Sequence, residues 1–211
     1  FAPMISSNEE ALKLIVKSIE KAGFKNGKQI SICLDVAANE LYKNKKYSIH
    51  SRKYINVEQT INKYLMLIKK FKIKSIEDPF FENDWLAWSK FNKTAKKIQI
   101  VGDDLYVTNL ERLKKGFLFE SSNSILIKLN QIGTVSETLD VIRFANNIGY
   151  KTVISHRSGD SEDTFIADLA VGTNSNQIKT GSLSRSERVS KYNQLIRIEE
   201  DLGSNARMNY L

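Results

Sequence analysis

The segment Ser155-His156-Arg157-Ser158-Gly159-Asp160 decides how the fold is read. The apolar, β-branched run Thr152-Val153-Ile154 precedes it, and the helix-like run 165–171 follows it. A strand, a turn and a helix therefore follow one another. An imidazole, a guanidinium and hydroxyls on the turn form a surface suited to phosphate or carboxylate. A basic turn before an acidic cluster is also common as a solvated loop, so this stretch alone leaves both interpretations open.

The same unit recurs through the second half of the chain. Strand-like runs begin near Gln99, Ser124, Thr152 and Gln177, at spacings of 25, 28 and 25 residues, and a helical stretch fills each gap. Unbroken apolar strands that alternate with helices are typical of a parallel sheet covered by helices. The sequence therefore predicts an α/β fold.

The first half adds two further strands, at 29–35 and 73–77. The capping pattern of Ser7 and Glu10, with apolar spacing, predicts a helix from Ser7 to Gly23, and apolar spacing predicts another over 57–71. A loop or small hairpin is expected at 42–51. Two more capping patterns, Thr134 with Glu137 and Ser184 with Glu187, predict later helix starts. Trp85 and Trp88 lie three apart in a helical stretch, where packing in the core is the expected role.

Composition is that of an ordinary globular protein. The 211 residues are 41% hydrophobic and 27% charged, with a net charge of +8. The lysines and arginines are scattered and have no aromatic residues interleaved, so nucleic acid is not expected as the main partner. No apolar run approaches a membrane span and no signal peptide is visible. We expect no membrane partner and a cytoplasmic location.

One cysteine, Cys33, excludes an internal disulfide and fits a reducing compartment. It lies in the apolar run 30–34, where a buried, inert thiol is expected. The chain begins at Phe1 and not at a methionine, which suggests a piece of a longer protein.

Polar side chains stand at or just beyond the end of all six predicted strands. In chain order they are Asp35, Glu77, Asp103 with Asp104, Lys128, His156 with Arg157 and Ser158, and Lys179. The carboxyl ends of parallel strands meet at one edge of a sheet, so these side chains are expected to converge there.

The acids and the lysines at this edge suit different tasks. Asp35, Glu77 and Asp103 offer the oxygen ligands that Mg²⁺ prefers, although acids at strand ends also cap helices or pair with lysines. Lys128 ends an apolar strand, and burying its charge in the core would be costly. Neighbouring cations disfavour each other's charge, so a lysine here can act as a base.

Seven runs, in order, resemble the enolase family. They are Leu34-Asp35-Val36-Ala37-Ala38, Ser75-Ile76-Glu77-Asp78-Pro79-Phe80, Val101-Gly102-Asp103-Asp104-Leu105, Lys128-Leu129-Asn130-Gln131-Ile132-Gly133, Ser155-His156-Arg157-Ser158-Gly159, Ile178-Lys179-Thr180-Gly181 and Lys191-Tyr192-Asn193-Gln194-Leu195. The resemblance implies a TIM-like β/α barrel and a carbon–oxygen lyase, phosphopyruvate hydratase, that interconverts 2-phosphoglycerate and phosphoenolpyruvate in glycolysis. A Lys base with Mg²⁺ is a known pattern of that superfamily.

The resemblance also implies roles for individual residues. Asp35, Glu77 and Asp103 would hold Mg²⁺, and Lys128 would be the general base. His156, Arg157, Ser158 and Lys179 would bind substrate, and Arg197 would lie at the contact of a homodimer or larger homo-oligomer.

Part of the family pattern is missing. The Asp-Glu-Gly-Gly run that carries the glutamate of the acid side is absent, as are the N-terminal domain and the first barrel strands. Residues 1–211 are therefore expected to form one domain, an incomplete barrel with about six of eight strands, and to be inactive alone. The alternatives are another lyase or racemase of the superfamily, or a non-catalytic module that binds RNA, a surface or an assembly partner.

Overall fold

The computed structural model describes residues 3–50, 53–175 and 177–208. The chain divides into two compact units. Unit 1 comprises residues 1–105 and 118–122, and unit 2 comprises residues 106–117 and 123–211. Each unit is described by itself below, and the expectation of a single domain over 1–211 stays a prediction.

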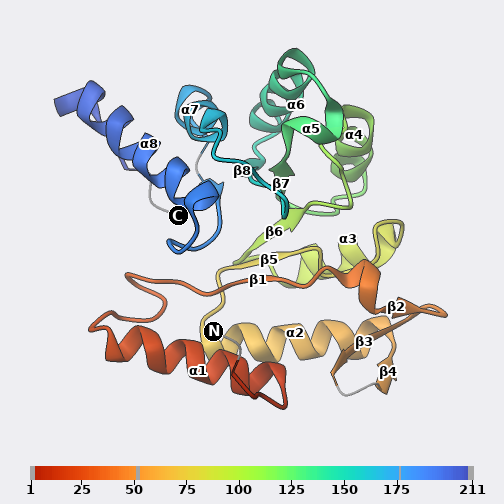
Figure 1. The fold of residues 1–211 in the computed structure, drawn as a ribbon. Helices are drawn as coiled ribbons and strands as arrows, with labels where there is room; N and C mark the ends of the chain where they lie inside the picture. Colours follow the sequence, from red (N-terminus) through yellow and green to blue (C-terminus); the bar gives the residue numbers. More distant parts are fainter. Residues whose placement is uncertain (1–2, 51–52, 176, 209–211) are drawn as a thin grey trace. The chain divides into compact units, whose positions relative to one another are not determined.

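Among its described residues, unit 1 contains three parallel strands and three α-helices, which are labelled in Figure 1. The helices are α1 (Asn8–Lys21), α2 (Val57–Phe71) and α3 (Trp85–Thr94), and the strands are β1 (Cys33–Asp35), β5 (Ser75–Glu77) and β6 (Gln99–Gly102). Strand β5 lies between β1 and β6 and is parallel to both. Both predicted early strands are thus present, each shorter than its apolar run.

Helix α1 begins at the predicted capping residue, and α2 begins at a capping residue that sequence reasoning did not name. The Ser7 side chain accepts a hydrogen bond from the Glu10 N–H, and Asn56 and Gln59 form a complete capping box at α2. Helix α2 spans the predicted residues 57–71, and α1 packs beside it (Figure 1). In α2, Ile61 and Tyr64 of the predicted apolar face are buried. In α1 the predicted face is wrong at Leu14 and Ile15, which are exposed, and the buried residues are Leu12 and Ile19.

The segment expected to be a loop or hairpin is a small antiparallel sheet. Its strands are β2 (Tyr42–Lys43), β3 (Lys46–His50) and β4 (Lys53–Ile55), and β3 pairs with both neighbours. The short 3₁₀ helix η1 (Ala38–Leu41) connects β1 to β2.

An aromatic cluster forms much of the core of unit 1. Tyr47, Tyr64, Trp88 and Phe91 surround Phe80, with ring centroids between 5.4 and 6.5 Å from its own. All five rings are fully buried, and edge-on pairs of this kind are favourable packing arrangements. Trp88 and Trp85 are both buried, which confirms the core role predicted for them.

Unit 2 repeats the strand and helix alternation. Its strands are β7 (Ser124–Ile127), β8 (Lys151–Ser155) and β9 (Gln177–Lys179). Its helices are α4 (Leu110–Leu118), α5 (Leu129–Ile132), α6 (Val135–Asn147), α7 (Phe165–Gly172) and α8 (Ser186–Leu202), with the 3₁₀ helix η2 (Gly203–Asn205) after them. Strand β8 lies between β7 and β9 and is parallel to both. Every residue of β7 is buried, as its unbroken apolar run predicts.

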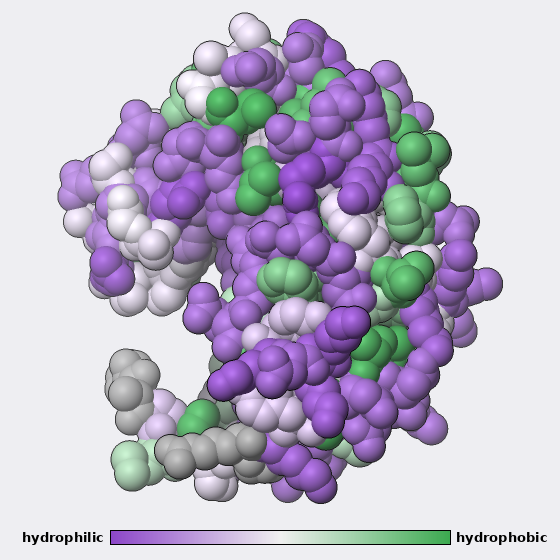
Figure 2. Space-filling view, turned by 90° about the vertical axis from the view of Figure 1, so that its right-hand side faces the viewer, coloured by the Kyte–Doolittle hydropathy of each residue, from purple (hydrophilic) through white to green (hydrophobic). Residues whose placement is uncertain are grey.

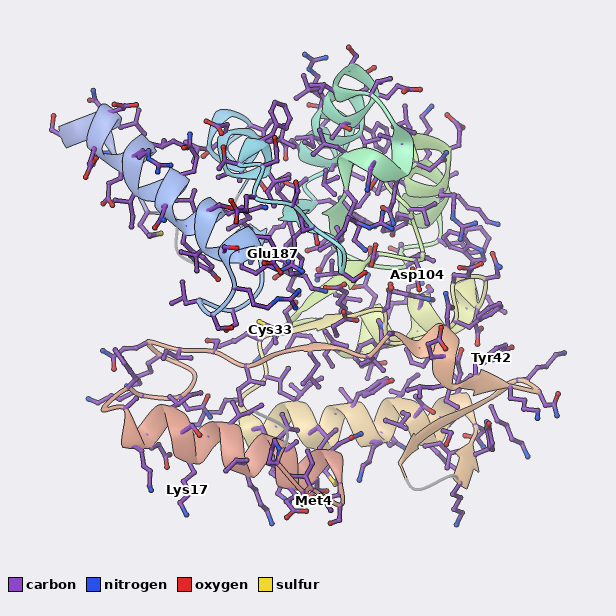
Figure 3. The ribbon with its side chains drawn as sticks, in the orientation of Figure 1. Met4, Lys17, Cys33, Tyr42, Asp104 and Glu187 are labelled. Atoms are coloured by element: carbon purple, nitrogen blue, oxygen red, sulfur yellow. The ribbon has the colours of Figure 1, made fainter. Side chains whose placement is uncertain are left out.

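Two further sequence expectations are wrong. Cys33, labelled on β1 in Figure 3, is exposed, not buried, because β1 is three residues long and, among the described residues of unit 1, pairs only with β5. The residue before α8 is Arg185, not Ser184, and its side chain makes no capping hydrogen bond. The Ser184 hydroxyl instead lies 3.1 Å from the Ser182 hydroxyl.

Polar residues cover most of the face seen in Figure 2, and the apolar side chains there are scattered in small groups. Among the described residues, none of the helices combines the length and the apolar character that a bilayer crossing requires.

Candidate active site

In unit 1 the three predicted acids follow three adjacent strands. Asp35 and Glu77 are the last residues of β1 and β5 and are Cα partners across the pair. Glu77 is paired in turn with Val101 of β6, and Asp103 follows two residues later. Glu77 and Asp103 are buried and Asp35 is exposed. The predicted placement of these acids at one edge of the sheet is therefore found within unit 1.

Asp78, directly after Glu77, shapes the loop that carries Asp103. The Asp78 backbone has φ of 44°, in the left-handed region, and its side chain is buried. Its two carboxylate oxygens accept hydrogen bonds from the Asp103 N–H at 2.9 Å and the Asp104 N–H at 2.8 Å. The turn after β6 is thus held by a carboxylate from the end of β5.

Three carboxylates crowd together at this turn. Single oxygens of Asp78, Asp103 and Asp104 lie within 4.8 Å of one another. Burial raises the pKa of Asp78 well above its ordinary value, the N–H groups of Asp104 and Asp103 offset part of this rise, and the charges of both neighbours add to it. A cation among these oxygens would relieve the repulsion, so the donor set fits a hard divalent ion. Asp103 is common to this cluster and to the predicted set.

The Asn39 side chain links the segment after β1 to the loops after β5 and β6. Its amide N–H₂ donates to Glu82 Oε2 at 3.0 Å and to Asp104 Oδ2 at 2.9 Å, and its side-chain oxygen accepts from the Glu82 N–H at 2.9 Å. The Asp104 side chain, labelled in Figure 3, is thereby oriented by a residue of η1. The acidic edge of unit 1 is a connected hydrogen-bond network.

In unit 2, Lys128 follows β7 directly. Its N–H donates to the Thr108 hydroxyl at 2.9 Å, and that hydroxyl donates to Gln131 Oε1 at 2.8 Å. Thr108 is fully buried and has a left-handed backbone, with φ of 53°. The Lys128 backbone is therefore fixed by a buried threonine from an earlier loop, and its side chain is partly exposed.

The turn after β8 lies against the end of β9. Ser155 is the Cα partner of Lys179, and the His156 N–H donates to the Lys179 carbonyl at 2.9 Å. This pairing places the predicted residues His156 and Lys179 on adjacent strand ends within unit 2.

The next two predicted residues, Arg157 and Ser158, are exposed. The Arg157 guanidinium donates to Asn130 Oδ1 at 2.8 Å, and Asn130 lies two residues after Lys128. The Arg157 side chain therefore reaches from the β8 turn toward the segment that carries the predicted base.

His156 is surrounded by cations. Burial lowers the pKa of His156, and the charges of Arg188, Lys179 and Lys128 lower it further, against a smaller opposing effect of Asp160. Its imidazole is therefore neutral at pH 7. The Nδ1 atom is buried and has no hydrogen-bond partner among the described residues.

Sequence reasoning gave no role to three charged residues that organise unit 2. Arg188 and Lys191 on α8 are buried, and both pair with Asp160 of the β8 turn. The three-residue spacing of these two cations on one helix face is a signal in the sequence. Cations on a helix are usually solvated, however, so the pattern did not predict a structural role for them. Asp78 was missed in the same way, because Glu77 beside it ends the strand.

The structure thus groups the predicted residues in two sets. Asp35, Glu77 and Asp103 belong to unit 1, and the second set, which belongs to unit 2, comprises Lys128, His156, Arg157, Ser158 and Lys179. Convergence of both sets on one substrate stays a prediction.

Comparison with known proteins identifies the family. The model of the family described as "Enolase, C-terminal TIM barrel domain" matches residues 1–210. The chain is 76% identical over 209 residues to the enolase of Pelagibacter ubique (strain HTCC1062). The aligned residues cover 99% of this chain and 50% of that protein. The chain therefore spans about half the length of this curated relative. Among the described residues, the six parallel strands of the two units alternate with helices, which agrees with an incomplete barrel of this α/β class. The chain belongs to the enolase family and is part of that family's C-terminal TIM barrel domain.

Proposed function

We propose that this chain supplies the metal ligands, the general base and the phosphate-binding turn of a phosphopyruvate hydratase, a carbon–oxygen lyase of glycolysis. The reaction is the Mg²⁺-dependent interconversion of 2-phospho-D-glycerate and phosphoenolpyruvate, in the cytoplasm and in a longer homodimeric protein. The observation that carries the proposal is the family match over essentially the whole chain, together with six motifs at strand ends and a seventh on α8.

In unit 1, Asp35, Glu77 and Asp103 are the proposed ligands of a divalent cation. All three donate carboxylate oxygen, and the neighbouring cluster of Asp78, Asp103 and Asp104 has excess negative charge. When bound, Mg²⁺ supplies positive charge beside the carboxylate oxygens of the substrate. The chain's own part is to hold the backbone of Asp103 through the Asp78 carboxylate.

In unit 2, Lys128 is the proposed base that removes the proton from carbon 2 of the substrate. The Thr108 hydroxyl accepts a hydrogen bond from the Lys128 N–H and so fixes the backbone from which the Lys128 side chain extends. The Arg157 guanidinium and the Ser158 hydroxyl bind the phosphate, together with the Lys179 ammonium. The neutral imidazole of His156 contributes a hydrogen bond and no further charge.

Helix α8 carries the proposed subunit contact. Arg197 is exposed on this helix, where its guanidinium donates to Gln194 Oε1 at 3.2 Å. An exposed arginine held by a neighbour on its own helix can reach a partner subunit with little loss of side-chain entropy.

A chimera tests the catalytic assignment. This chain replaces the matched segment of the Pelagibacter ubique enolase, and turnover of 2-phosphoglycerate is followed with and without Mg²⁺. We expect Mg²⁺-dependent turnover, and we expect Lys128→Ala to lower kcat by at least about 10²-fold, because a positioned base contributes that much. Lys151→Ala is the matched control, since Lys151 is exposed and begins β8 at the end opposite His156. Equal activity of the two variants would refute the role of Lys128.

Thermal shift separates this proposal from the alternatives. Stabilisation of the chimera by phosphoenolpyruvate, but not by an unphosphorylated hydroxy acid, supports a phosphorylated substrate. Binding of RNA with a steep salt dependence, and no response to Mg²⁺ or phosphoenolpyruvate, would favour a non-catalytic binding module.

A further inference from the structure

Two cations of helix α8 are buried beneath the turn that follows β8. Arg188 is 6% exposed and Lys191 is 1% exposed. Burying a charged side chain is costly unless it is paired and fully hydrogen-bonded. The contacts of these two residues therefore show what their burial accomplishes.

Lys191 uses all three donors of its ammonium group. Nζ donates to Asp160 Oδ1 at 3.1 Å, to the Glu187 carbonyl at 2.7 Å and to the Ser161 carbonyl. An ammonium has three N–H groups, so none is left without a partner. Two of the three bonds cross from α8 to the β8 turn.

Arg188 holds the part of the turn that carries the proposed phosphate ligands. Nη1 donates to the Arg157 carbonyl at 2.9 Å and Nη2 donates to the Ser158 carbonyl at 3.0 Å. The planar guanidinium offers two parallel donors, so it fixes the carbonyls of two consecutive residues at once. A lysine in its place could not reproduce this fork.

Asp160 completes the arrangement from within the turn. Its oxygens accept from the Arg157 N–H at 2.9 Å and from the Ser161 N–H at 2.8 Å, and Nη1 of Arg188 lies 3.7 Å away. Partial burial raises the pKa of Asp160, but the bonds from Arg157 N–H and Lys191 outweigh this effect and lower it below its ordinary value. Asp160 is therefore an anion between two buried cations.

Together these contacts form hydrogen bonds from α8 to backbone carbonyls on one side of the turn. The carbonyls of Arg157, Ser158 and Ser161 face α8, and the exposed side chains of Arg157 and Ser158 remain for a ligand. We propose that Arg188 and Lys191 are positioning residues, which hold the 156–161 turn in the conformation that presents Arg157 and Ser158 to a phosphate. This inference rests on the proposed function for the identity of the ligand.

Arg188 also acts on His156 through its charge. The groups that act electrostatically on His156 are Arg188 from α8, Lys179 from β9, Lys128 after β7 and Asp160 of the turn itself. Among these neighbours, the effect of Arg188 is the largest. A change at Arg188 should therefore be visible in the titration of His156, which a role in packing alone would not predict.

The test uses the ¹⁵N-labelled chain with Arg188→Met, Arg188→Lys and, as matched control, Arg185→Met. Arg185 is 67% exposed in its side chain and pairs with Glu187, labelled on α8 in Figure 3. The chain has only two histidines, so the ring signals of His156 can be followed across pH. Amide shifts of the turn give the Kd for phosphoenolpyruvate.

We expect Arg188→Met to raise the pKa of His156, to shift the Ser158 and Gly159 amides and to weaken phosphoenolpyruvate binding about 10–100-fold, as for other residues that support a ligand-binding group. Arg188→Lys should keep the native His156 titration and recover part of the affinity, and Arg185→Met should behave as the native chain. A His156 titration and turn amides in Arg188→Met that match those of Arg185→Met would overturn the proposal.

Two further results remain informative. If Arg188→Met does not fold, an affinity of Arg188→Lys equal to that of the native chain overturns the proposal, whereas a reduced affinity with an unchanged His156 titration supports it. If the isolated chain does not bind phosphoenolpyruvate, the same variants are compared for binding in the chimera, where a failure to bind would count against the proposed function, and the His156 titration with the turn amides still decides whether α8 positions the turn.

Discussion

At the scale of single residues, Gly181 limits how closely α8 can approach the end of β9. Its φ is 81°, and a Cβ atom there would lie 2.9 Å from Cδ of Arg188. Gly181→Ala should therefore lower the free energy of unfolding by about 1–3 kcal/mol, from backbone strain and displacement of Arg188. Urea unfolding followed by tryptophan fluorescence measures this change.

Gly172→Ala is the matched control for that prediction. Gly172 ends α7, and a Cβ atom there meets nothing within 4 Å. Alanine in a helix without strain should leave stability equal or higher. A loss of stability at Gly172 as large as at Gly181 would show that the geometry around Arg188 is not responsible.

His156 makes stability depend on pH. Its pKa in the folded chain is below the ordinary value of 6.5, so the unfolded chain binds the proton more readily. Stability is therefore complete above the ordinary pKa and falls as the pH drops from there toward the lower pKa of the folded state. Unfolding in urea near pH 7.5 and near pH 5.5 measures the loss, which His156→Gln should reduce. An equal loss in both proteins would assign the pH dependence to other groups.

The residue scale is also where sequence reasoning was least complete. Asp35, Glu77 and Asp103 could be named because parallel strands end together, which needs only the strand pattern. Asp78 and Arg188 could not, because nothing in a linear pattern shows that a charged side chain will be buried and hydrogen-bonded to a backbone far away in the sequence. Such partners become visible only in three dimensions.

At the scale of elements, the starts of α6 and α8 differ in a way that can be measured. The Thr134 hydroxyl accepts a hydrogen bond from the Glu137 N–H at 3.2 Å and caps α6, whereas the residue before α8 makes no side-chain capping hydrogen bond. Thr134→Ala should cost about 0.5–2 kcal/mol of stability, as is usual when a cap is lost. Ser184→Ala should cost clearly less. Equal losses in urea unfolding would show that Ser184 contributes to α8 after all.

The same comparison shows how far local patterns determine elements. The bounds of α2 were predicted correctly from its apolar face, and the capping box of Asn56 and Gln59 in the structure agrees with them. The pattern of Ser184 and Glu187 resembled a capping box equally well, yet Glu187 pairs with Arg185 and the helix begins later. Strand β1 is shorter than its apolar run, so Cys33 is exposed, because strand length depends on pairing with a neighbour and not on hydrophobicity alone.

At the scale of the whole molecule, we predict that the 211 residues by themselves turn over 2-phosphoglycerate far more slowly than the chimera. The glutamate of the acid side is not among these residues, and a missing acid costs about 10²–10⁴-fold. The measurement is the rate of phosphoenolpyruvate formation by equal concentrations of the two proteins. A rate for the isolated chain near that of the chimera would contradict the prediction.

The fold class could be predicted at this scale because strand and helix alternate at a regular spacing. The number of parallel strands, three in each unit among the described residues, follows from the same pattern. The predicted convergence of the acid set of unit 1 and the cation set of unit 2 concerns how the two units are placed, which apolar patterns within single elements do not encode.

The contact of α8 with the β8 turn has a consequence for protein synthesis. The groups that hold the Ser158 carbonyl lie 30 residues downstream, so the turn leaves the ribosome before its supports do. During that interval the emerged segment has Asp160 without its lysine partner, and the turn is not yet ordered. Helix α8 must therefore leave the ribosome before this region can mature, and a pause while α8 is still inside would prolong the exposure of the turn to proteases and chaperones.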